Sequence, residues 1–410
     1  MTTVTRRTLM LSAGAAGLAT LLPGRINATW AQDADTIRLG LTTALTGPYN
    51  EFGEGCRRGF DLAIDLWNAA GGINGKKIEI VTALDDQMVP DRAAQNMRRL
   101  LDDPSLVGIL GPAGSGATMA VIDMATADGR PYVNALAQAT PATYPDGIDK
   151  PPRANVFTFG ILSPVEAEVL GTYIAKSYKK IGLMHESTAY GVSGRDTLTN
   201  VIKAANGDVE ITPEAYNQRA TDVTAQLVRI QRAGVEALLV VGLGTDLVNI
   251  RRSMLRLGLE LPLVTSAGGL SLPYFEGAGE AAVGTIAPMV SVLVRDNPRP
   301  EVTRFIEEYK RKFGTDRYWG PDPEHPQLQM SLIVIPAFDG ANVLFEGIKA
   351  AGSTEPEKVI AAIEGLKDLP GVNAVYSFTA QRHHGIQPES LSMLRVIKKG
   401  DGIGLEVLEG

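Results

Sequence analysis

Residues 37–86 read IRLGLTTALTGPYNEFGEGCRRGFDLAIDLWNAAGGINGKKIEIVTALDD, and this stretch decides the fold. An apolar run over Ile37–Leu41 predicts a strand, and Thr46-Gly47-Pro48 ends it because proline cannot continue a strand ladder. Apolar side chains at three- and four-residue spacing over Gly55–Ala69 predict an amphipathic helix. A glycine pair ends this helix, and Ile78–Leu84 predicts the next strand.

Strand, helix and strand in this order form a right-handed crossover unit of a parallel sheet. In open sheets of this kind a ligand lies outside the carboxyl ends of the strands, so the Thr46–Phe52 loop is a candidate site wall. The rest of the chain repeats the alternation, which predicts an α/β protein, and its 410 residues predict two lobes. Further strands are predicted at Leu106–Leu110, Pro131–Asn134, Lys180–His185, Val209–Ala215, Ala237–Val241 and Leu261–Ser266.

The residues that end the predicted strands and the helix of the opening stretch resemble those of the branched-chain amino-acid type of periplasmic binding protein. Proteins of this type are the solute receptors of ABC importers. The shared features are the S/T-G-P turn, the pair Phe52-Gly53, a helix ending in N-x-x-GGI-x-G and a strand ending at Asp85-Asp86. Matches continue over Gly182–Gly191, over Asp222–Leu239 and over residues 338–353. The resemblance implies two Rossmann-like lobes with parallel-sheet cores, joined by a three-strand hinge.

The expected lobe boundaries follow from where the chain crosses between lobes. Crossings are predicted near Phe157–Phe159, Ile286–Pro288 and Tyr376–Phe378. The N-terminal lobe is then residues 36–157 and 289–377, and the C-terminal lobe is residues 158–288 and 378–410.

Residues 1–31 predict a signal peptide. Arg6-Arg7 precede an apolar run, Leu9–Leu22, that is too short to span a bilayer comfortably. The arginine pair resembles the twin-arginine export signal, and Thr29-Trp30-Ala31 offers small residues for cleavage. An uncleaved anchor is the alternative, but the segment has no acidic residue and no lipobox cysteine follows it. We therefore expect a bacterial periplasmic protein that is soluble after cleavage.

Charge and cysteine content restrict the partners. The net charge is −7, and loss of the three arginines of residues 1–31 shifts it to −10. This charge disfavours nucleic acid and anionic membranes, and no later stretch predicts a membrane helix. Cys56 is the single cysteine and is expected to be a buried small apolar residue. The resemblance implies a monomer without a cofactor that docks on the membrane subunits of an ABC permease.

The loop Gly111–Thr118 is the first candidate binding site. It follows a predicted strand and precedes a predicted helix, so its backbone amides and the Ser115 hydroxyl form an anion site in outline. Ala117 stands where a phosphate loop requires lysine, and Ala113 replaces the first glycine of a nucleophile elbow. The resemblance assigns Ser115 and Gly116 to the carboxylate of the ligand, and a plain helix N-cap is the alternative for Ser115.

The resemblance places the rest of the carboxylate clamp at Ala137, Gln138 and Ala139. Gln138 takes the register of the family's usual threonine, and its amide both donates and accepts hydrogen bonds. Phe52 and Tyr190 fall where the family has aromatic residues on opposite lobes, which cover an apolar or planar ligand as the lobes close. Packing at the lobe interface is the alternative for both aromatic residues.

The largest departure from the family concerns the amino group of an amino-acid ligand. Receptors of this type pair the ammonium with an acidic residue after the Leu261–Val264 strand, but here Ala267-Gly268 stand in that loop, with Ala267 in the acid's register. Leu243 also replaces a polar aromatic residue, which makes this wall more apolar. Because an unpaired buried ammonium is costly, we expect an apolar or aromatic carboxylate, or an amide, in place of leucine. Carboxylates that would restore amino-acid binding are sought at Asp246, Glu186 and Glu276.

The sequence contains no set of residues that matches a known enzyme motif. His383-His384 have no cysteine or Glu-x-x-His partner at metal-ligand spacing, which favours a solvated loop or a hinge role. Asp85-Asp86 fit capping of the following helix better than acid–base work. A sensor domain of the same fold that reports to a signalling partner is the second candidate function, and a hydrolase follows it. We expect binding without chemistry, by hinge closure of two lobes.

Overall fold

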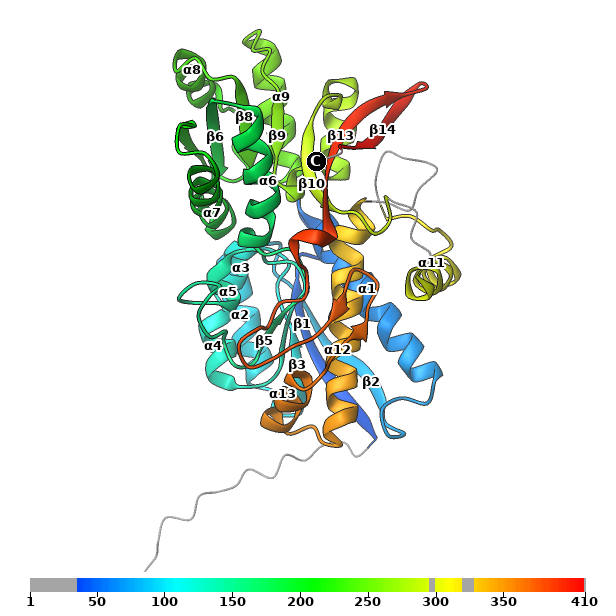
Figure 1. The fold of residues 1–410 in the computed structure, drawn as a ribbon. Helices are drawn as coiled ribbons and strands as arrows, with labels where there is room; N and C mark the ends of the chain where they lie inside the picture. Colours follow the sequence, from blue (N-terminus) through cyan, green and yellow to red (C-terminus); the bar gives the residue numbers. More distant parts are fainter. Residues whose placement is uncertain (1–34, 295–298, 319–327, 409–410) are drawn as a thin grey trace, which may run out of the picture.

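The computed structural model describes residues 35–294, 299–318 and 328–408. The chain forms two α/β lobes, one above the other in Figure 1, and each lobe is built on its own sheet. The α/β class and the two parallel-sheet cores predicted from the sequence are confirmed. The predicted signal peptide lies outside the described residues, and so do Arg6-Arg7.

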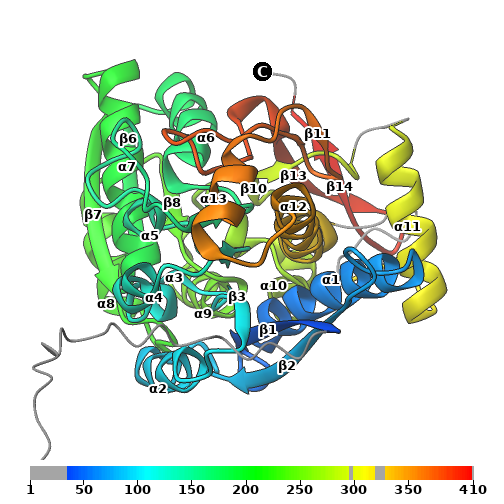
Figure 2. The ribbon, with the colours of Figure 1, turned by 90° about the horizontal axis from the view of Figure 1, so that it is seen from below.

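The lower lobe of Figure 1 contains an all-parallel sheet with the order β2-β1-β3-β4-β5. Its strands are β1 (Thr36–Thr43), β2 (Lys77–Asp85), β3 (Leu106–Leu110), β4 (Tyr132–Asn134) and β5 (Val156–Thr158). Its first helices are α1 (Asn50–Ala69), α2 (Pro90–Leu101), α3 (Ser115–Met119), α4 (Ile122–Asp128) and α5 (Thr140–Thr143). The sheet is covered on both faces, as parallel sheets are, with α1 on one side and α2 on the other (Figure 2).

The upper lobe contains a seven-stranded sheet with the order β14-β13-β10-β9-β8-β6-β7. Its strands are β6 (Lys180–Glu186), β7 (Glu210–Tyr216), β8 (Ala237–Val241), β9 (Leu263–Thr265), β10 (Ile286–Val290), β13 (Leu391–Lys399) and β14 (Gly402–Val407). Its helices are α6 (Ser163–Ser177), α7 (Ala189–Ala205), α8 (Thr224–Arg232), α9 (Gly244–Arg256), α10 (Leu272–Ala278), and the short turns η1 (Ala267–Gly269), η2 (Gly279–Ala282) and η4 (Pro388–Ser390). β6 to β10 run parallel, whereas β13 and β14 are antiparallel additions at one edge.

The remaining helices complete the lower lobe. They are α11 (Pro300–Phe313), α13 (Pro356–Glu364), and a continuous helix made of the π-helical turn η3 (Met330–Val334) and α12 (Ile335–Ala351). The strands β11 (Leu369–Pro370) and β12 (Val375–Tyr376) form a small hairpin. Asp339 on α12 holds this hairpin by accepting hydrogen bonds from the N–H groups of Val372 and Asn373 and from the Tyr376 hydroxyl.

Among the described residues one helix, Met330–Ala351, has the length and apolar composition of a membrane span, which the sequence analysis did not pick out. Its apolar window is 89% buried inside the protein. The helix packs along α1, where Phe345 meets the edge of Trp67. Its hydrophobicity is therefore that of a core helix.

The chain passes between the two sheets after β5, after β10 and before β13. The first and third passages lie side by side, because the Thr158 N–H donates to the His383 carbonyl at 2.8 Å and the Gly385 N–H donates to the Thr158 carbonyl at 3.1 Å. The second passage borders the third, since the Ser291 N–H donates to the Ser390 carbonyl at 3.1 Å. Backbone hydrogen bonds thus connect all three passages, while the exact lobe boundaries stay a prediction.

The histidine pair lies in the third passage and is buried. His383 is 0% exposed and stacks on Phe157, with the ring centroids 4.2 Å apart. His384 Nδ1 lies 2.6 Å from the Tyr144 hydroxyl, and burial lowers the pKa of His384 to about 4. The solvated-loop alternative for this pair is therefore wrong, and the hinge alternative agrees with its position.

Candidate functional site

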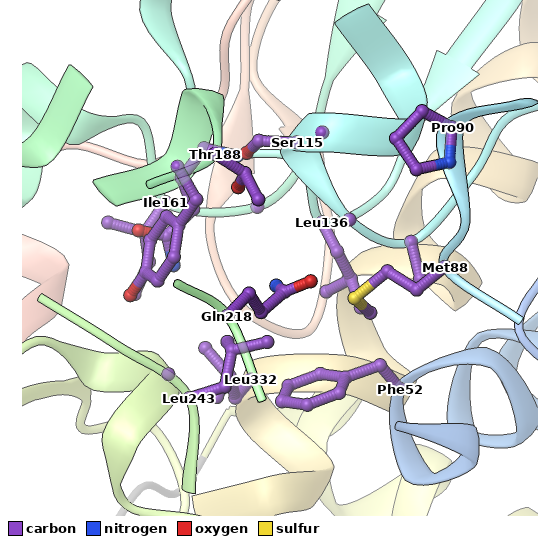
Figure 3. Close-up of a pocket in the computed structure, with 17 residues that line it drawn as sticks. Phe52, Met88, Pro90, Ser115, Leu136, Ile161, Thr188, Gln218, Leu243 and Leu332 are labelled. Carbon is purple, nitrogen blue, oxygen red and sulfur yellow. Dashed lines mark hydrogen bonds between the residues drawn. The ribbon is translucent and has the colours of Figure 1, made fainter. Parts of the chain in front are cut away.

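A cavity lies between the two sheets, where loops at the carboxyl ends of strands from both lobes meet (Figure 3). The space open to water in it has a volume of about 60 Å³. This edge is where parallel α/β sheets bind ligands. The cavity is lined by Phe52, Met88, Pro90, Ala113, Gly114, Ser115, Gly116, Leu136, Gln138, Gly160, Ile161, Thr188, Tyr190, Gln218, Leu243, Gly268 and Leu332.

Asp85 and Asp86 shape the first loop of the wall. Asp85 Oδ1 accepts hydrogen bonds from the N–H groups of Leu45 at 2.9 Å and Thr46 at 3.2 Å. Asp86 Oδ1 accepts a hydrogen bond from the Met88 N–H at 2.7 Å. The following helix, α2, has no side-chain cap. The prediction that this pair caps α2 is wrong, because the carboxylates are used to hold the β1–α1 loop and the turn before α2.

Two aromatic–glycine pairs occupy equivalent places in the two lobes. Phe52-Gly53 lies in the first turn of α1, and Tyr190-Gly191 lies in the first turn of α7. A Cβ on the first glycine would come within 2.0 Å of the backbone oxygen of Ala44, and one on the second within 1.9 Å of that of Glu186. Only glycine lets each helix start so close to the end of the preceding strand. This close approach brings both aromatic side chains to the cavity.

Ser115 is held by the loop that follows β4. Its Oγ accepts hydrogen bonds from the N–H groups of Gln138 at 3.0 Å and Ala139 at 3.1 Å. These bonds occupy both lone pairs, so the hydroxyl has only its proton to offer a ligand. Gly114 is the N-cap residue of α3, and no side-chain cap bond is made there. The plain N-cap interpretation of Ser115 is therefore wrong.

Gln138 joins the two lobes and lines the cavity. Its backbone carbonyl accepts hydrogen bonds from both the N–H and the hydroxyl of Ser163, at the start of α6, at 2.9 Å each. The side chain is 7% exposed, and its Oε1 has no hydrogen-bond partner in the described part of the chain. An unpaired buried amide oxygen costs free energy, so a ligand that donates to it gains affinity.

The rest of the wall is apolar. Phe52, Met88, Leu136, Leu243 and Leu332 surround the space in Figure 3. Among the described residues that line the cavity there is no aspartate, glutamate, lysine, arginine or histidine. A small molecule in this cavity would therefore meet neutral hydrogen-bonding groups and hydrocarbon.

Two hydroxyl groups of the cavity wall already donate hydrogen bonds to other side chains of the protein. The Thr188 hydroxyl donates to Glu186 Oε1, and the Tyr190 hydroxyl donates to Ser266 Oγ at 2.7 Å. Burial raises the pKa of Tyr190 well above its ordinary value. Tyr190 is therefore neutral, and its hydrogen bond to Ser266 holds the ring in position.

Ala267 takes the position at which the sequence analysis looked for an ammonium-binding acid, and a carboxylate from another element contacts it. Glu166 on α6 accepts the Ala267 N–H at 2.6 Å through Oε1. Glu166 is 2% exposed, and burial raises the pKa of its carboxyl to about 7. It influences Tyr190 electrostatically but does not line the cavity.

The three carboxylates proposed to restore amino-acid binding do not line the cavity either. Glu186 accepts backbone N–H groups at the start of α7. Asp246 Oδ1 accepts a hydrogen bond from the Tyr49 hydroxyl at 3.1 Å, and burial raises the pKa of Asp246 to about 6. Glu276 is exposed on α10.

Further contacts join the lobes around the cavity. The Arg219 guanidinium donates to the Gln87 carbonyl at 3.1 Å and lies over the Tyr49 ring, 5.2 Å from its centroid. The Thr140 N–H donates to Ser193 Oγ at 3.2 Å. The lobes are thus in contact at several points of the rim.

Most of the predicted site residues line the cavity, namely Phe52, Ser115, Gly116, Gln138, Tyr190, Leu243 and Gly268. Ala137, Ala139 and Ala267 are buried but do not line it. The sequence analysis missed the lining residues Met88, Pro90, Leu136, Thr188 and Gln218. It also missed Gly160 and Ile161 in the first passage and Leu332 in the long core helix. The local pattern around the last three gives no signal, because only tertiary packing brings them to the cavity.

The two lobes, with a cavity between facing strand ends and three adjacent connecting passages, define a bilobed binding protein. The family model described as "Periplasmic binding protein" matches residues 36–401. The chain belongs to this family.

Relatives and solved structures agree with this assignment. A leucine-, isoleucine-, valine-, threonine- and alanine-binding protein of Pseudomonas aeruginosa is 26% identical over 82% of this chain and 84% of its own length. A crystal structure of a type 1 periplasmic binding protein from Bordetella pertussis Tohama I is 52% identical, with a TM-score of 0.88, and covers 91% of this chain and 100% of that one. The branched-chain amino acid transporter substrate binding protein of Streptococcus pneumoniae, in complex with isoleucine, shares the fold at 21% identity, with a TM-score of 0.74, over 91% of this chain and 99% of that one.

Proposed function

We propose that this protein is an exported, substrate-binding receptor of an ABC importer. The observation that carries the proposal is the cavity whose wall comes from both lobes, with Phe52 on one side and Tyr190 on the other. A ligand that contacts both walls stabilises the closed arrangement, because it binds that arrangement better than one with the lobes apart. The branched-chain amino acids named for the relatives support a small solute as the ligand.

The mechanism is binding without chemistry. Ser115 and Gln138 hold the polar head of the solute, together with the backbone of Gly116. The apolar body packs against the walls described above, and closure removes this surface from water. Ala137, Ala139 and Ala267-Gly268 fix the shape of the loops. The membrane subunits of the permease then recognise the closed form of a monomeric receptor that carries no cofactor.

The solute is a branched-chain or related amino acid, an apolar or aromatic carboxylate, or an amide. Because Ala267 offers no carboxylate to an ammonium group, the last two classes are favoured over leucine. Residues 1–31 direct export through the twin-arginine route and are then cleaved, which places the receptor in the periplasm. The expected division into residues 36–157 with 289–377, and 158–288 with 378–410, describes the two moving bodies.

A thermal-shift screen of the purified mature protein tests this proposal, because a ligand that binds only the folded state raises the melting temperature by mass action. The screen contains branched-chain amino acids, apolar and aromatic carboxylates, and amides. Any ligand found is then tested for closure by small-angle X-ray scattering, where the radius of gyration decreases. Leu255→Ala, at a side chain that is 59% exposed, is the control and keeps the response. Absence of a shift with every class overturns the proposal.

A further inference from the structure

The polar side chains that line the cavity include two carboxamides. Gln138 comes from the loop after β4 in the lower lobe, and Gln218 comes from the loop between β7 and α8 in the upper lobe. Figure 3 shows the Gln218 side chain extending into the space, toward Leu136 and Met88. Each lobe therefore presents an amide, a group that donates and accepts at the same time, to the same cavity.

The groups around Gln138 leave one hydrogen-bond donor, at Ser115, and one acceptor, at Gln138 Oε1, open to a ligand. Ser115 has only a proton to donate, because its oxygen already accepts from the N–H groups of Gln138 and Ala139. Gln138 Oε1 is buried and lacks a donor. If the amide is turned by 180°, its N–H₂ group takes that place and lacks an acceptor. A ligand head that only accepts therefore satisfies at most one end of the amide.

The charges behind the wall are mostly negative. Glu166 and Glu186 both act electrostatically on Tyr190, which lines the cavity, and Asp246 lies close to Glu186. Arg219 is the cation that faces Asp246. An anionic ligand in this cavity would meet no cation among the described lining residues and would lie near these buried acids.

We propose that the ligand is a neutral solute with a primary carboxamide head on an apolar body, and that Gln138 selects this head group. This inference rests on the receptor function proposed above and names its ligand class. The ligand carbonyl accepts the Ser115 proton, and the ligand N–H₂ group donates to Gln138 Oε1. A carboxylate has no proton for Gln138 Oε1, can accept from this side chain only after the amide turns, and brings a charge that meets no cation among the described lining residues. An α-amino acid adds an ammonium group that meets no lining carboxylate.

Three solutes that share an isobutyl body test the proposal by isothermal titration calorimetry at pH 7: isovaleramide, isovalerate and leucine. We expect the wild-type protein to bind the amide at least about tenfold more tightly than the carboxylate or the amino acid, as loss of one buried hydrogen bond predicts. Gln138→Thr and Gln138→Met, two variants that remove the amide at different lengths, are expected to reduce this preference to less than about threefold. Gln231→Thr makes the same chemical change on the exposed face of α8 and is expected to leave the preference intact.

The outcomes separate this inference from the receptor function. If isovalerate or leucine binds more tightly than the amide and still decreases the radius of gyration, the receptor stands and the inference is overturned. An amide preference that persists in both Gln138 variants also overturns it. If neither this series nor the matched series of benzamide, benzoate and phenylalanine binds, the inference and the receptor function fall together.

Discussion

The Tyr49 hydroxyl donates a hydrogen bond to Asp246 Oδ1 across 3.1 Å, and this bond connects the two lobes. Tyr49 precedes α1 in one lobe, whereas Asp246 lies in the first turn of α9 in the other. Both residues are buried, at 0% and 1% exposure, and Asp246 Oδ2 has no partner among the described residues. In this arrangement of the lobes the Asp246 carboxyl group is removed from water, with the tyrosine as its partner from the opposite lobe.

Tyr49→Phe is expected to weaken ligand binding by about tenfold, because a buried acceptor then loses a hydrogen bond worth about 1–2 kcal/mol. Calorimetric titration with the ligand found in the screen measures the change. Tyr274→Phe is the matched control, since the Tyr274 hydroxyl bonds to Thr285 within one lobe. That control should lower thermal stability and leave affinity unchanged. Equal losses of affinity in both variants would contradict a role in closure.

Glu51 is expected to make ligand binding depend on pH. It is 1% exposed, beside Ser271 of the opposite lobe, and burial raises the pKa of its carboxyl from 4.5 to about 8. With the lobes apart the carboxyl returns toward its ordinary pKa, so closure takes up a proton between these two values. Closure is then unaffected by this group below about pH 4.5 and becomes harder as the pH rises toward 8.

Titrations from pH 6 to pH 9 should accordingly show an affinity that falls by about tenfold or more. Glu51→Gln, which resembles the protonated form, should flatten this dependence. Burial also raises the pKa of Asp246, from 3.8 to about 6, so this group adds a slope of the same sign mainly below the range of these titrations. An unchanged slope in the variant would show that Glu51 does not titrate on closure.

Gly53→Ala is expected to destabilise the fold by about 2 kcal/mol or more, because the new Cβ would overlap the backbone of Ala44 and force α1 to move. Urea unfolding followed by circular dichroism gives the free energy of unfolding. Gly207→Ala is the control, since its Cβ would meet no atom closer than the Lys203 carbonyl oxygen at 3.8 Å. Similar stabilities of the two variants would refute the close-approach explanation.

Replacement of both Arg6 and Arg7 by lysine keeps the charge of the leader but removes the arginine pair. If export uses the twin-arginine route, the precursor should accumulate in the cytoplasm and the mature protein should be missing from the periplasmic fraction. Immunoblotting of cell fractions measures both. Arg25→Lys, outside the pair, should be exported normally, and normal export of the double variant would rule out this route.

Local patterns predicted much of the fold. The strand runs, and the turns that end them, have their signals within a few residues, so β3, β6 and β8 fall close to their predicted bounds. Phe52 and Tyr190 were also predictable, because each stands directly before the glycine that allows its helix to start. Such features depend on neighbours in the sequence.

The failures involve residues that are distant in the sequence or unusual in the backbone. Glu166 contacts Ala267 across 101 positions, and no periodicity indicates that contact. Asp85-Asp86 do not cap α2 because Gln87 and Met88 adopt positive φ values of 52° and 56°, and the carboxylates bond to the loops beside them. The sequence showed an acid pair before a helix but could not show this turn.

The three hydrogen-bonded passages between the lobes have a mechanical consequence. The third passage is bonded to the first at Thr158 and to the second at Ser291, so the three passages can bend together, whereas sliding one past another would break these bonds. Rotation of the lobes by such bending would keep the bonds intact. If the protein serves a permease as proposed above, that permease would meet a receptor that is either open or closed, whatever the shape of the solute.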